Sequence, residues 1–219
     1  MRRLVIVRPE PGASATARAA AATDLDPVIL PLFEVRPLEW KAPDPAHYDA
    51  LLLTSANASR HAGDQLERLK TLTAHCVGDA TAASARAAGL SVGQTGNGGV
   101  GALLRALSPE LKLLHLCGAD RKASDEAVQS IDALPVYESV EVAQPLVNLS
   151  GSVVLLHSPR AASAFARRAG PERSTIAMAA ISPETAEAAG GGWEHIEVAS
   201  EPTDAELLAI ASRLCNKRP

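Results

Sequence analysis

The chain of 219 residues contains an internal repeat in which two strand-to-helix turns recur in the same order. Residues 48–60 (YDALLLTSANASR) correspond to residues 151–163 (GSVVLLHSPRAAS), since each segment is an apolar run that ends in a small hydroxyl residue before an alanine-rich stretch. Residues 77–89 and 181–190 form a second pair, and the offset is 103 residues in the first pair and 104 in the second. A repeat at constant spacing predicts two similar halves that face each other, each the size of an ordinary domain.

The composition favours parallel sheets in both halves. Hydrophobic residues make up 47% of the chain but aromatic residues only 3%, so the cores must consist of Ala, Val, Leu and Ile. From residue 48 onward, short apolar runs alternate with helical stretches, as in βαβ units. Residues 31–37 and 134–141 are extended segments containing proline, which we interpret as connections. We therefore expect an α/β fold with a discontinuous domain, residues 1–33 plus 140–219, and an inserted domain, residues 34–139.

Charge and cysteine content argue against several classes of function. The net charge of -4, the isoelectric point near 5.9 and the lack of a basic run argue against nucleic-acid binding. Cys76, Cys117 and Cys215 are odd in number and far apart, which indicates neither a disulfide framework nor a zinc site. The apolar run after Met1 is too short for a signal sequence and no run reaches membrane-spanning length, so we expect a cytoplasmic protein that does not enter a membrane.

Small polar residues follow the predicted strands of the first repeated turn, where ligands bind in open parallel sheets. In the two copies they are Thr54, Ser55 and Asn57, and then Ser158 and Arg160. Such residues either act only as helix caps, or cap the helix and leave other first-turn N–H groups to hold a carboxylate or phosphate. Their recurrence in both copies favours anion binding.

The second repeated turn adds Gly78, Thr81 and Thr185. Gly78 permits a close approach of the backbone to a ligand. The two threonines either bind the same ligand or satisfy backbone carbonyls within their own helices. Because they occur as a pair, we favour ligand binding.

Four further residues stand near predicted strand ends or in a connection. Arg8 and Arg121 each follow a predicted strand, and Gly118 begins the loop that holds Arg121. A guanidinium there could bind a carboxylate bidentately, or it could simply be solvated. Tyr137 lies in the second connecting segment, where its phenol could donate a proton or hydrogen bond to a leaving group. Alternatively, its ring packs between the domains as a hinge anchor.

The segment 96–101 (GNGGVG) matches the dinucleotide-binding pattern G-x-G-x-x-G, and Asp120 follows at about the expected distance. The preceding strand, residues 91–94, is short and weakly apolar, whereas the first strand of a dinucleotide-binding unit is a hydrophobic run. We interpret the segment as a flexible loop and keep a nicotinamide site as an alternative. The histidines show no metal-ligand spacing.

Several short motifs occur in a fairly specific order along the whole chain. They are Arg8-Pro9, residues 48–55 (YDALLLTS), residues 77–82 (VGDATA), Val136-Tyr137, Ser158-Pro159 and Thr185-Ala186. Together they resemble the uroporphyrinogen-III synthase family. The resemblance implies two flavodoxin-like parallel-sheet domains joined by a two-stranded connection.

The resemblance also implies a reaction. In this family the linear tetrapyrrole hydroxymethylbilane loses its hydroxyl, its ring D is inverted through a spiro intermediate, and the macrocycle closes as uroporphyrinogen III. The enzyme is a cyclising hydro-lyase of tetrapyrrole (haem, sirohaem, chlorophyll, cobalamin) biosynthesis, and no metal or organic cofactor is implied. The substrate carries acetate and propionate arms, so the predicted anion-binding turns suit its charge. We expect a monomer; whether the preceding pathway enzyme makes a transient contact to hand over the substrate stays open.

The same resemblance gives roles to individual residues. It implies that Tyr137 assists the departure of the hydroxyl and that Thr81 and Thr185 bind carboxylate arms, with Ser55 and Ser158 behind them. Three positions depart from the repeat or from the family: His157 stands where the first copy has Thr54, Ser182 replaces a more usual glycine, and Cys117 precedes Gly118 where an arginine is common. Two other classes of function remain as alternatives, a non-catalytic two-domain sensor of small anions and a nicotinamide-dependent oxidoreductase.

Overall fold

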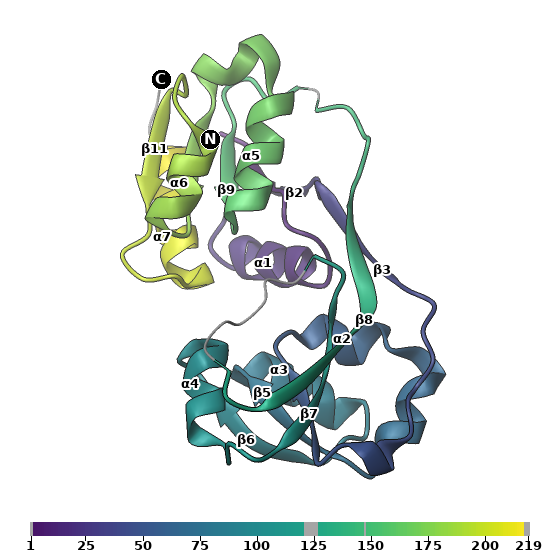
Figure 1. Cartoon of the computed structure of the whole chain (residues 1–219). Coiled ribbons are helices and arrows are strands. Elements are labelled where there is room, and N and C mark those ends of the chain that lie inside the picture. Colours follow the sequence, from purple (N-terminus) through teal and green to yellow (C-terminus); the bar gives the residue numbers. More distant parts are fainter. Residues whose placement is uncertain (1, 121–126, 147, 217–219) are drawn as a thin grey trace. The chain divides into compact units, whose positions relative to one another are not determined.

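Strands and helices alternate along most of the chain in the computed structural model, which describes residues 2–120, 127–146 and 148–216 (Figure 1). The contacts divide the chain into two compact units. Unit 1 is Met1–Glu34 with Glu141–Pro219, and unit 2 is Val35–Val140. Each unit is a mainly parallel sheet with helices on both faces, which confirms the predicted α/β class.

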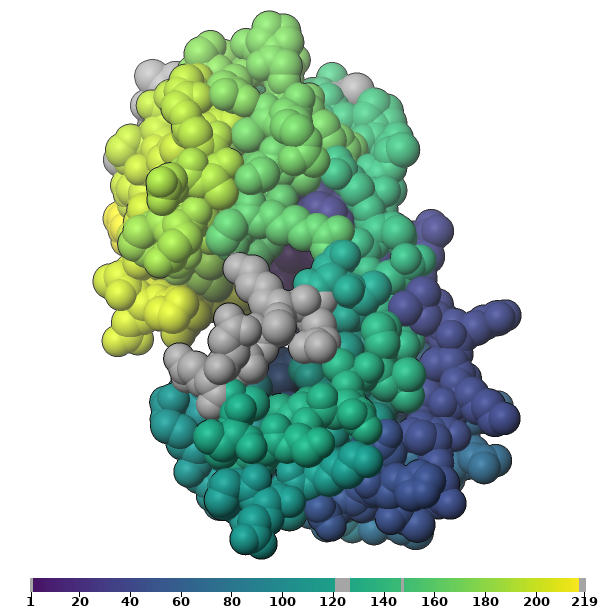
Figure 2. Space-filling view, viewed as in Figure 1, coloured from purple at the N-terminus to yellow at the C-terminus, as the bar shows by residue number. Residues whose placement is uncertain are grey.

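Unit 1 is built on a five-stranded parallel sheet in the order β11-β10-β9-β1-β2. Its strands are β1 (Leu4–Ile6), β2 (Pro27–Ile29), β9 (Val153–Leu156), β10 (Ala177–Ala180) and β11 (His195–Val198). The N-terminal strand β1 lies between β2 and β9, with Leu4 opposite Pro27 and Val153. Segments from the N-terminal and C-terminal parts of the sequence therefore form one sheet. On the surface of this unit, N-terminal residues in purple are visible beside green residues from the later part of the chain (Figure 2).

Helices cover both faces of the first sheet. They are α1 (Gly12–Ala21), α5 (Pro159–Arg168), α6 (Pro183–Ala189) and α7 (Asp204–Asn216), with the short 3-10 helix η3 (Gly170–Thr175). Leu4 and Ile6 belong to the core beneath α1 and α7, whereas Val5 and Val7 belong to the core beneath α5 and α6. This alternation explains why the central strands are continuously apolar in sequence.

Unit 2 is built on a six-stranded sheet in the order β3-β8-β7-β4-β5-β6. Its strands are β3 (Phe33–Pro37), β4 (Ala50–Leu53), β5 (Thr73–Val77), β6 (Val92–Gly96), β7 (Lys112–Gly118) and β8 (Ser130–Glu141). Its helices are α2 (Ala56–His61), α3 (Asp79–Ala87) and α4 (Gly99–Ala106), with the 3-10 helices η1 (Pro45–His47) and η2 (Gly63–Leu69). The helices α2 and α3 and η2 share one core, and α4 covers the other face.

Two segments connect the units, β3 and β8, and they are hydrogen-bonded neighbours. The Leu38 N–H donates to the Val136 carbonyl, and the Val142 N–H donates to the Leu32 carbonyl. Residue numbers rise along one strand as they fall along the other, so the pair is antiparallel. The predicted two-stranded connection is confirmed, although β8 begins at Ser130 rather than near residue 134, because its pairing with β7 starts there.

None of the helices in the described part of the chain is long and apolar enough to cross a membrane.

Candidate active site

The candidate site residues gather where strands end, at the carboxyl edge of each sheet. In unit 2, Thr54 and Ser55 follow β4 and Gly78 follows β5. In unit 1, Arg8 follows β1 and Ser158 follows β9. Because β4 pairs with β5 and β1 pairs with β9, each set lies on neighbouring strands of one parallel sheet. Each unit thus presents polar groups at the edge where open α/β sheets bind ligands.

Serine hydroxyls cap the helices that start at this edge. Ser55 Oγ accepts a hydrogen bond of 3.2 Å from the Asn57 amide, and Ser158 Oγ accepts one of 3.2 Å from the Ala161 amide. A hydroxyl that accepts in a cap still has its own proton to donate. Both serines therefore cap their helices, and each hydroxyl can still donate a hydrogen bond to a carboxylate.

The second pair of turns differs between the copies. Gly78 precedes α3 with φ of +83°, where a residue with a side chain would be strained, and it provides no side-chain cap. Its counterpart Ser182 has φ of −155°, and its hydroxyl accepts from the Thr185 amide at 3.3 Å. The repeat therefore conserves the strand-to-helix turn but not its backbone conformation.

The two threonines of these helices are buried. Thr81 exposes about 5% of its surface and Thr185 none. The Thr185 hydroxyl lies 3.2 Å from the Ser182 hydroxyl, with which it can share a hydrogen bond. In this conformation Thr185 can influence a ligand only through the Ser182 hydroxyl.

The ring of Tyr137 packs directly against Gly118. A β-carbon on Gly118 would come within 2.8 Å of Tyr137 Cζ and 3.1 Å of its hydroxyl oxygen, so the absence of a side chain makes room for the ring. The His61 ring also lies near Tyr137: the two ring centroids are 6.3 Å apart, and the ring planes are tilted by 40° to each other. Burial, with the nearby Arg60 charge, lowers the pKa of His61. Sequence reasoning did not single out His61, which has no motif around it.

The Thr54 hydroxyl has a buried partner in the neighbouring strand. Thr54 Oγ1 lies 3.0 Å from His115 Nε2, and the His115 side chain is buried on β7. The contact orients the Thr54 hydroxyl at the strand end. His115 was not predicted as a site residue, because it lies inside an apolar run far from Thr54 in sequence.

A charged cluster forms at the carboxyl edge of unit 1. Arg8 Nη1 donates to both carboxylate oxygens of Asp204 at 3.0 Å and to Thr16 Oγ1 at 3.3 Å. The Thr16 hydroxyl donates to Asp204 Oδ2 at 2.7 Å. The buried His157 ring places Nε2 at 3.3 Å from Asp204 Oδ1, an ion-pair distance without the alignment of a hydrogen bond.

This cluster holds Asp204 in its ionised form. The His157 ring, then the Thr16 hydrogen bond and the Arg8 charge, keep the pKa of Asp204 well below its usual range, against the opposing effect of burial. Sequence reasoning identified Arg8 but neither Asp204 nor Thr16 as site residues. Asp204 also begins a helix after a strand, so the rule that selected the repeated turns would have selected it.

The remaining candidate residues are Arg160, Asn57 and Arg121. The Arg160 guanidinium lies over the Phe33 ring, 4.5 Å from its centroid, where a cation–π contact orients it. Asn57 is a half-buried residue of the first turn of α2. Arg121 lies outside the described residues.

The glycine-rich segment 96–101 runs from the end of β6 into α4, and β6 is an edge strand of its sheet. A β-carbon on Gly96 would come within 3.1 Å of Leu103 Cβ, so this glycine allows α4 to pack closely. None of the five residues of this strand is buried, unlike the residues of the buried strand that precedes a dinucleotide-binding loop. Within residues 2–120, 127–146 and 148–216, no group of three or more His, Cys, Asp or Glu side chains is arranged to hold a metal ion.

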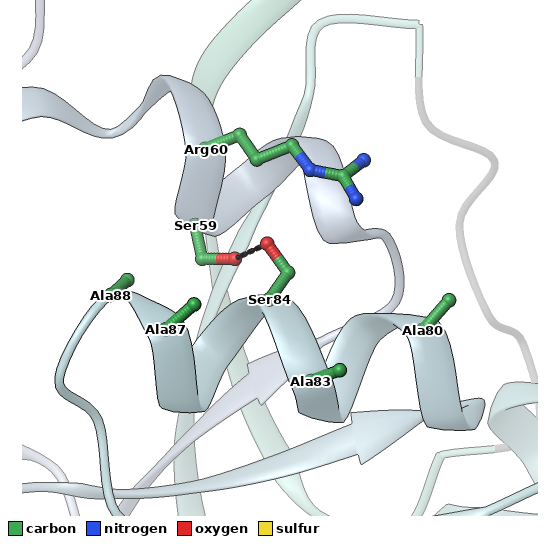
Figure 3. A pocket seen from close by; sticks show the side chains of 7 residues that line it. All are labelled: Ser59, Arg60, Ala80, Ala83, Ser84, Ala87 and Ala88. Carbon is green, nitrogen blue, oxygen red and sulfur yellow. Dashed lines mark hydrogen bonds between the residues drawn. The ribbon is translucent and has the colours of Figure 1, made fainter. Parts of the chain in front are cut away.

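A hollow of about 540 Å³ lies between α2 and α3 (Figure 3). Four alanines line it, with Ser59, Ser84 and Arg60. The two serine hydroxyls are 2.8 Å apart and bond to each other at its wall. None of the predicted site residues lines it.

The two units, each a parallel sheet flanked by helices and joined through a pair of antiparallel strands, define a two-domain α/β protein of the flavodoxin-like kind. A family model described as "Uroporphyrinogen-III synthase HemD" matches residues 14–209. The chain belongs to the uroporphyrinogen-III synthase family.

Solved structures share the fold. The uroporphyrinogen-III synthetase of Helicobacter pylori is 20% identical with a TM-score of 0.71, over 98% of this chain and 100% of that one. A mutant uroporphyrinogen III synthase from Thermus thermophilus is 15% identical with a TM-score of 0.54, over 100% of each chain. A comparison with curated proteins found no significant match. The family match confirms the predicted family and its synthase activity. It does not favour either alternative, the sensor of small anions or the nicotinamide-dependent oxidoreductase.

Proposed function

We propose that this chain converts hydroxymethylbilane into uroporphyrinogen III, by removing the terminal hydroxyl as water, inverting ring D and closing the macrocycle. The family match over residues 14–209 carries this proposal. Water leaves and no other group is transferred, so the reaction is that of a cyclising hydro-lyase. The polar edges of the two sheets support the proposal, because the substrate carries a carboxylate on each of its many side arms.

The leaving hydroxyl needs a proton or a hydrogen bond as its bond to carbon breaks. Tyr137 is our candidate donor, and Gly118 is the residue that makes room for its ring. Departure of the hydroxyl leaves a positive charge on the adjacent pyrrole and its methylene carbon, and ring D attacks this carbon to form the spiro intermediate. The original bond between ring D and its bridging methylene then breaks, which moves the positive charge to that methylene. The free α-carbon of ring D bonds to it and loses a proton, and the macrocycle closes. The protein's main contribution is to hold the flexible chain in a curled conformation in which these bonds can form.

Carboxylate arms of the substrate would be held by hydroxyl and amide donors at the strand ends. Ser55 and Ser158 have protons to donate while they cap their helices, and Asn57 stands in the same turn as Ser55. Thr54 would donate from the orientation that His115 gives it. Thr81, Thr185, Gly78, Arg160 and Arg8 belong to the same proposed set, with Thr185 acting through Ser182. Arg121 also belongs to it, although it lies outside the described residues.

The domain boundaries, residues 1–33 plus 140–219 and 34–139, belong to the same proposal, and the grouping of contacts into two units supports them. The proposal also includes a monomeric state, a cytoplasmic location and a transient contact with the enzyme that makes the unstable substrate.

The test is to give the purified protein hydroxymethylbilane made enzymatically in the same vessel. The product is oxidised and its isomers are separated by chromatography. Spontaneous closure forms the type I isomer, so the proposal requires type III product that increases with enzyme concentration. Saturable binding of uroporphyrin without formation of type III would instead support an anion sensor.

A further inference from the structure

Among the described residues, the Arg8 guanidinium makes its hydrogen bonds through Nη1 alone. Its Nη1 donates to both oxygens of Asp204 and to Thr16. None of the described residues accepts a hydrogen bond from its Nε or Nη2. The side chain keeps about 31% of its surface exposed. The guanidinium therefore retains an Nε–Nη2 edge, which has the geometry to bind a carboxylate through two parallel hydrogen bonds.

Gly12 determines where the guanidinium can lie. A β-carbon at this position would come within 2.6 Å of Arg8 Nε and 2.9 Å of its Nη2. The guanidinium thus lies against the backbone of the first turn of α1, in space that any other residue type would fill. The lack of a β-carbon at Gly12 therefore leaves the space that the Arg8 guanidinium occupies.

Asp204 is itself restrained by contacts from other elements. Oδ2 accepts from the Thr16 hydroxyl of α1, and Oδ1 faces the His157 ring, which follows β9. Asp204 is the first residue of α7, where the helix dipole favours a carboxylate. Residues from three other segments of unit 1 thus contact the Asp204 carboxylate, and the carboxylate binds Arg8 through a single nitrogen, Nη1.

We propose that Asp204 is a positioning residue that, together with Gly12, directs the Nε–Nη2 edge of Arg8 toward a carboxylate arm of the substrate. This inference rests on the proposed function and deepens it, because it assigns the binding edge of one cation and the residues that aim it. Asp204 touches Arg8 and not the substrate. Its removal weakens substrate binding although it removes a negative charge from a site for anions.

Two rival roles for Asp204 predict different results. If the carboxylate merely competed with the substrate for Arg8, then Asp204→Asn would lower KM. If the ion pair only supported the fold, then Asp204→Asn would lower the thermal midpoint of unfolding and leave the KM of the folded protein unchanged. A positioning role predicts a higher KM that depends on Arg8.

The experiment measures kcat and KM for type III product in the wild type, Arg8→Gln, Asp204→Asn and the double variant. The wild-type measurement comes first, and failure to form type III would remove the proposed function itself. We expect Asp204→Asn to raise KM about tenfold with little change in kcat, the size of one lost charge-assisted interaction. In the Arg8→Gln background it should change KM less than twofold. An unchanged or lower KM, or equal fold-changes in both backgrounds, would overturn the proposal.

Glu194→Gln is the matched control. Glu194 pairs with Arg2 near the amino ends of the strands of the same sheet, with Nη1 and Oε1 3.0 Å apart. We expect its KM to stay within twofold of the wild type. A KM change equal to that of Asp204→Asn would show a general effect of losing an ion pair, and would overturn the assignment to Asp204.

Gly12→Ala provides a second route that leaves the ion-pair residues unchanged. The new methyl group displaces only the end of a flexible side chain, and alanine favours a helix more than glycine does. We expect KM to rise about fivefold or more while the thermal midpoint of unfolding stays the same or rises. If Asp204→Asn fails to fold, this variant decides the question, and an unchanged KM would overturn the proposal.

Discussion

Gly118 and Tyr137 are in such close contact that a single methyl group would separate them: a β-carbon on Gly118 would lie 2.8 Å from Tyr137 Cζ. Both are candidate site residues, and they are paired in register on the neighbouring strands β7 and β8. The glycine therefore sets the position of the tyrosine ring. Substitution of the glycine tests the position of the ring, and substitution of the tyrosine tests the role of its hydroxyl.

We expect Gly118→Ala to displace the ring and to lower kcat about tenfold. Its φ lies outside the positive region, so the backbone is not strained by alanine. The check combines turnover with near-ultraviolet circular dichroism, which reports the environment of tyrosine rings. A displaced ring with normal turnover would exclude Tyr137 from the reaction.

Tyr137→Phe keeps the ring and removes only the hydroxyl. We expect kcat to fall about tenfold, less than the full effect of a lost proton donor, because positioning of the substrate contributes most of the catalysis. Binding of uroporphyrin III, followed by its fluorescence, should stay within twofold. Unchanged turnover would return Tyr137 to a packing role beside Gly118.

Ser158 serves as a helix cap and as a proposed carboxylate donor, and two substitutions distinguish these roles. Ser158→Ala should lower the free energy of unfolding by about 1 kcal/mol, through loss of the cap to the Ala161 amide, and also raise KM. Ser158→Asp restores a cap but adds a negative charge, so we expect normal stability with a larger rise in KM. Denaturant unfolding and steady-state kinetics check the two effects. A normal KM for Ser158→Asp would leave Ser158 with the capping role alone.

The low pKa of Asp204 predicts an acid dependence of stability. A carboxylate whose pKa is lowered on folding stabilises the protein above its unfolded pKa near 3.8, and this contribution is lost as pH falls below that value toward the folded one. We expect the wild type to exceed Asp204→Asn in free energy of unfolding at pH 6 and the difference to shrink progressively below about pH 4. Urea unfolding from pH 6 to pH 2.5 measures it. A constant difference across this range would contradict the ionised cluster.

Much of the fold could be predicted because it depends on patterns that repeat along the chain. The apolar runs of the repeated segments 48–60 and 151–163 are the strands β4 (Ala50–Leu53) and β9 (Val153–Leu156) in the structure. The proline-containing segments are predicted to be connections, since proline is unsuited to the centre of a sheet. The beginning of β8 was missed because residues 130–133 are held by pairing with β7 and not by an apolar pattern of their own.

The candidate site could be predicted only where local sequence reports on local structure. Ser55 and Ser158 follow strands and precede helices, which is visible in sequence, and both are caps. The partners His115 and Asp204 are 61 and 196 residues away from Thr54 and Arg8, and only the folded sheet brings them together. The burial of Thr185 likewise results from helix packing, which no short motif records.

The central claim is that this chain directs ring inversion, and the isomer ratio of the product tests it most directly. Enzymatically made hydroxymethylbilane is incubated with and without the protein, and the oxidised products are separated into type I and type III. The account predicts mainly type III with the protein and type I without it, with the type III fraction lowered in Tyr137→Phe at equal enzyme concentration. Type I alone at every concentration of the wild-type protein would contradict the account.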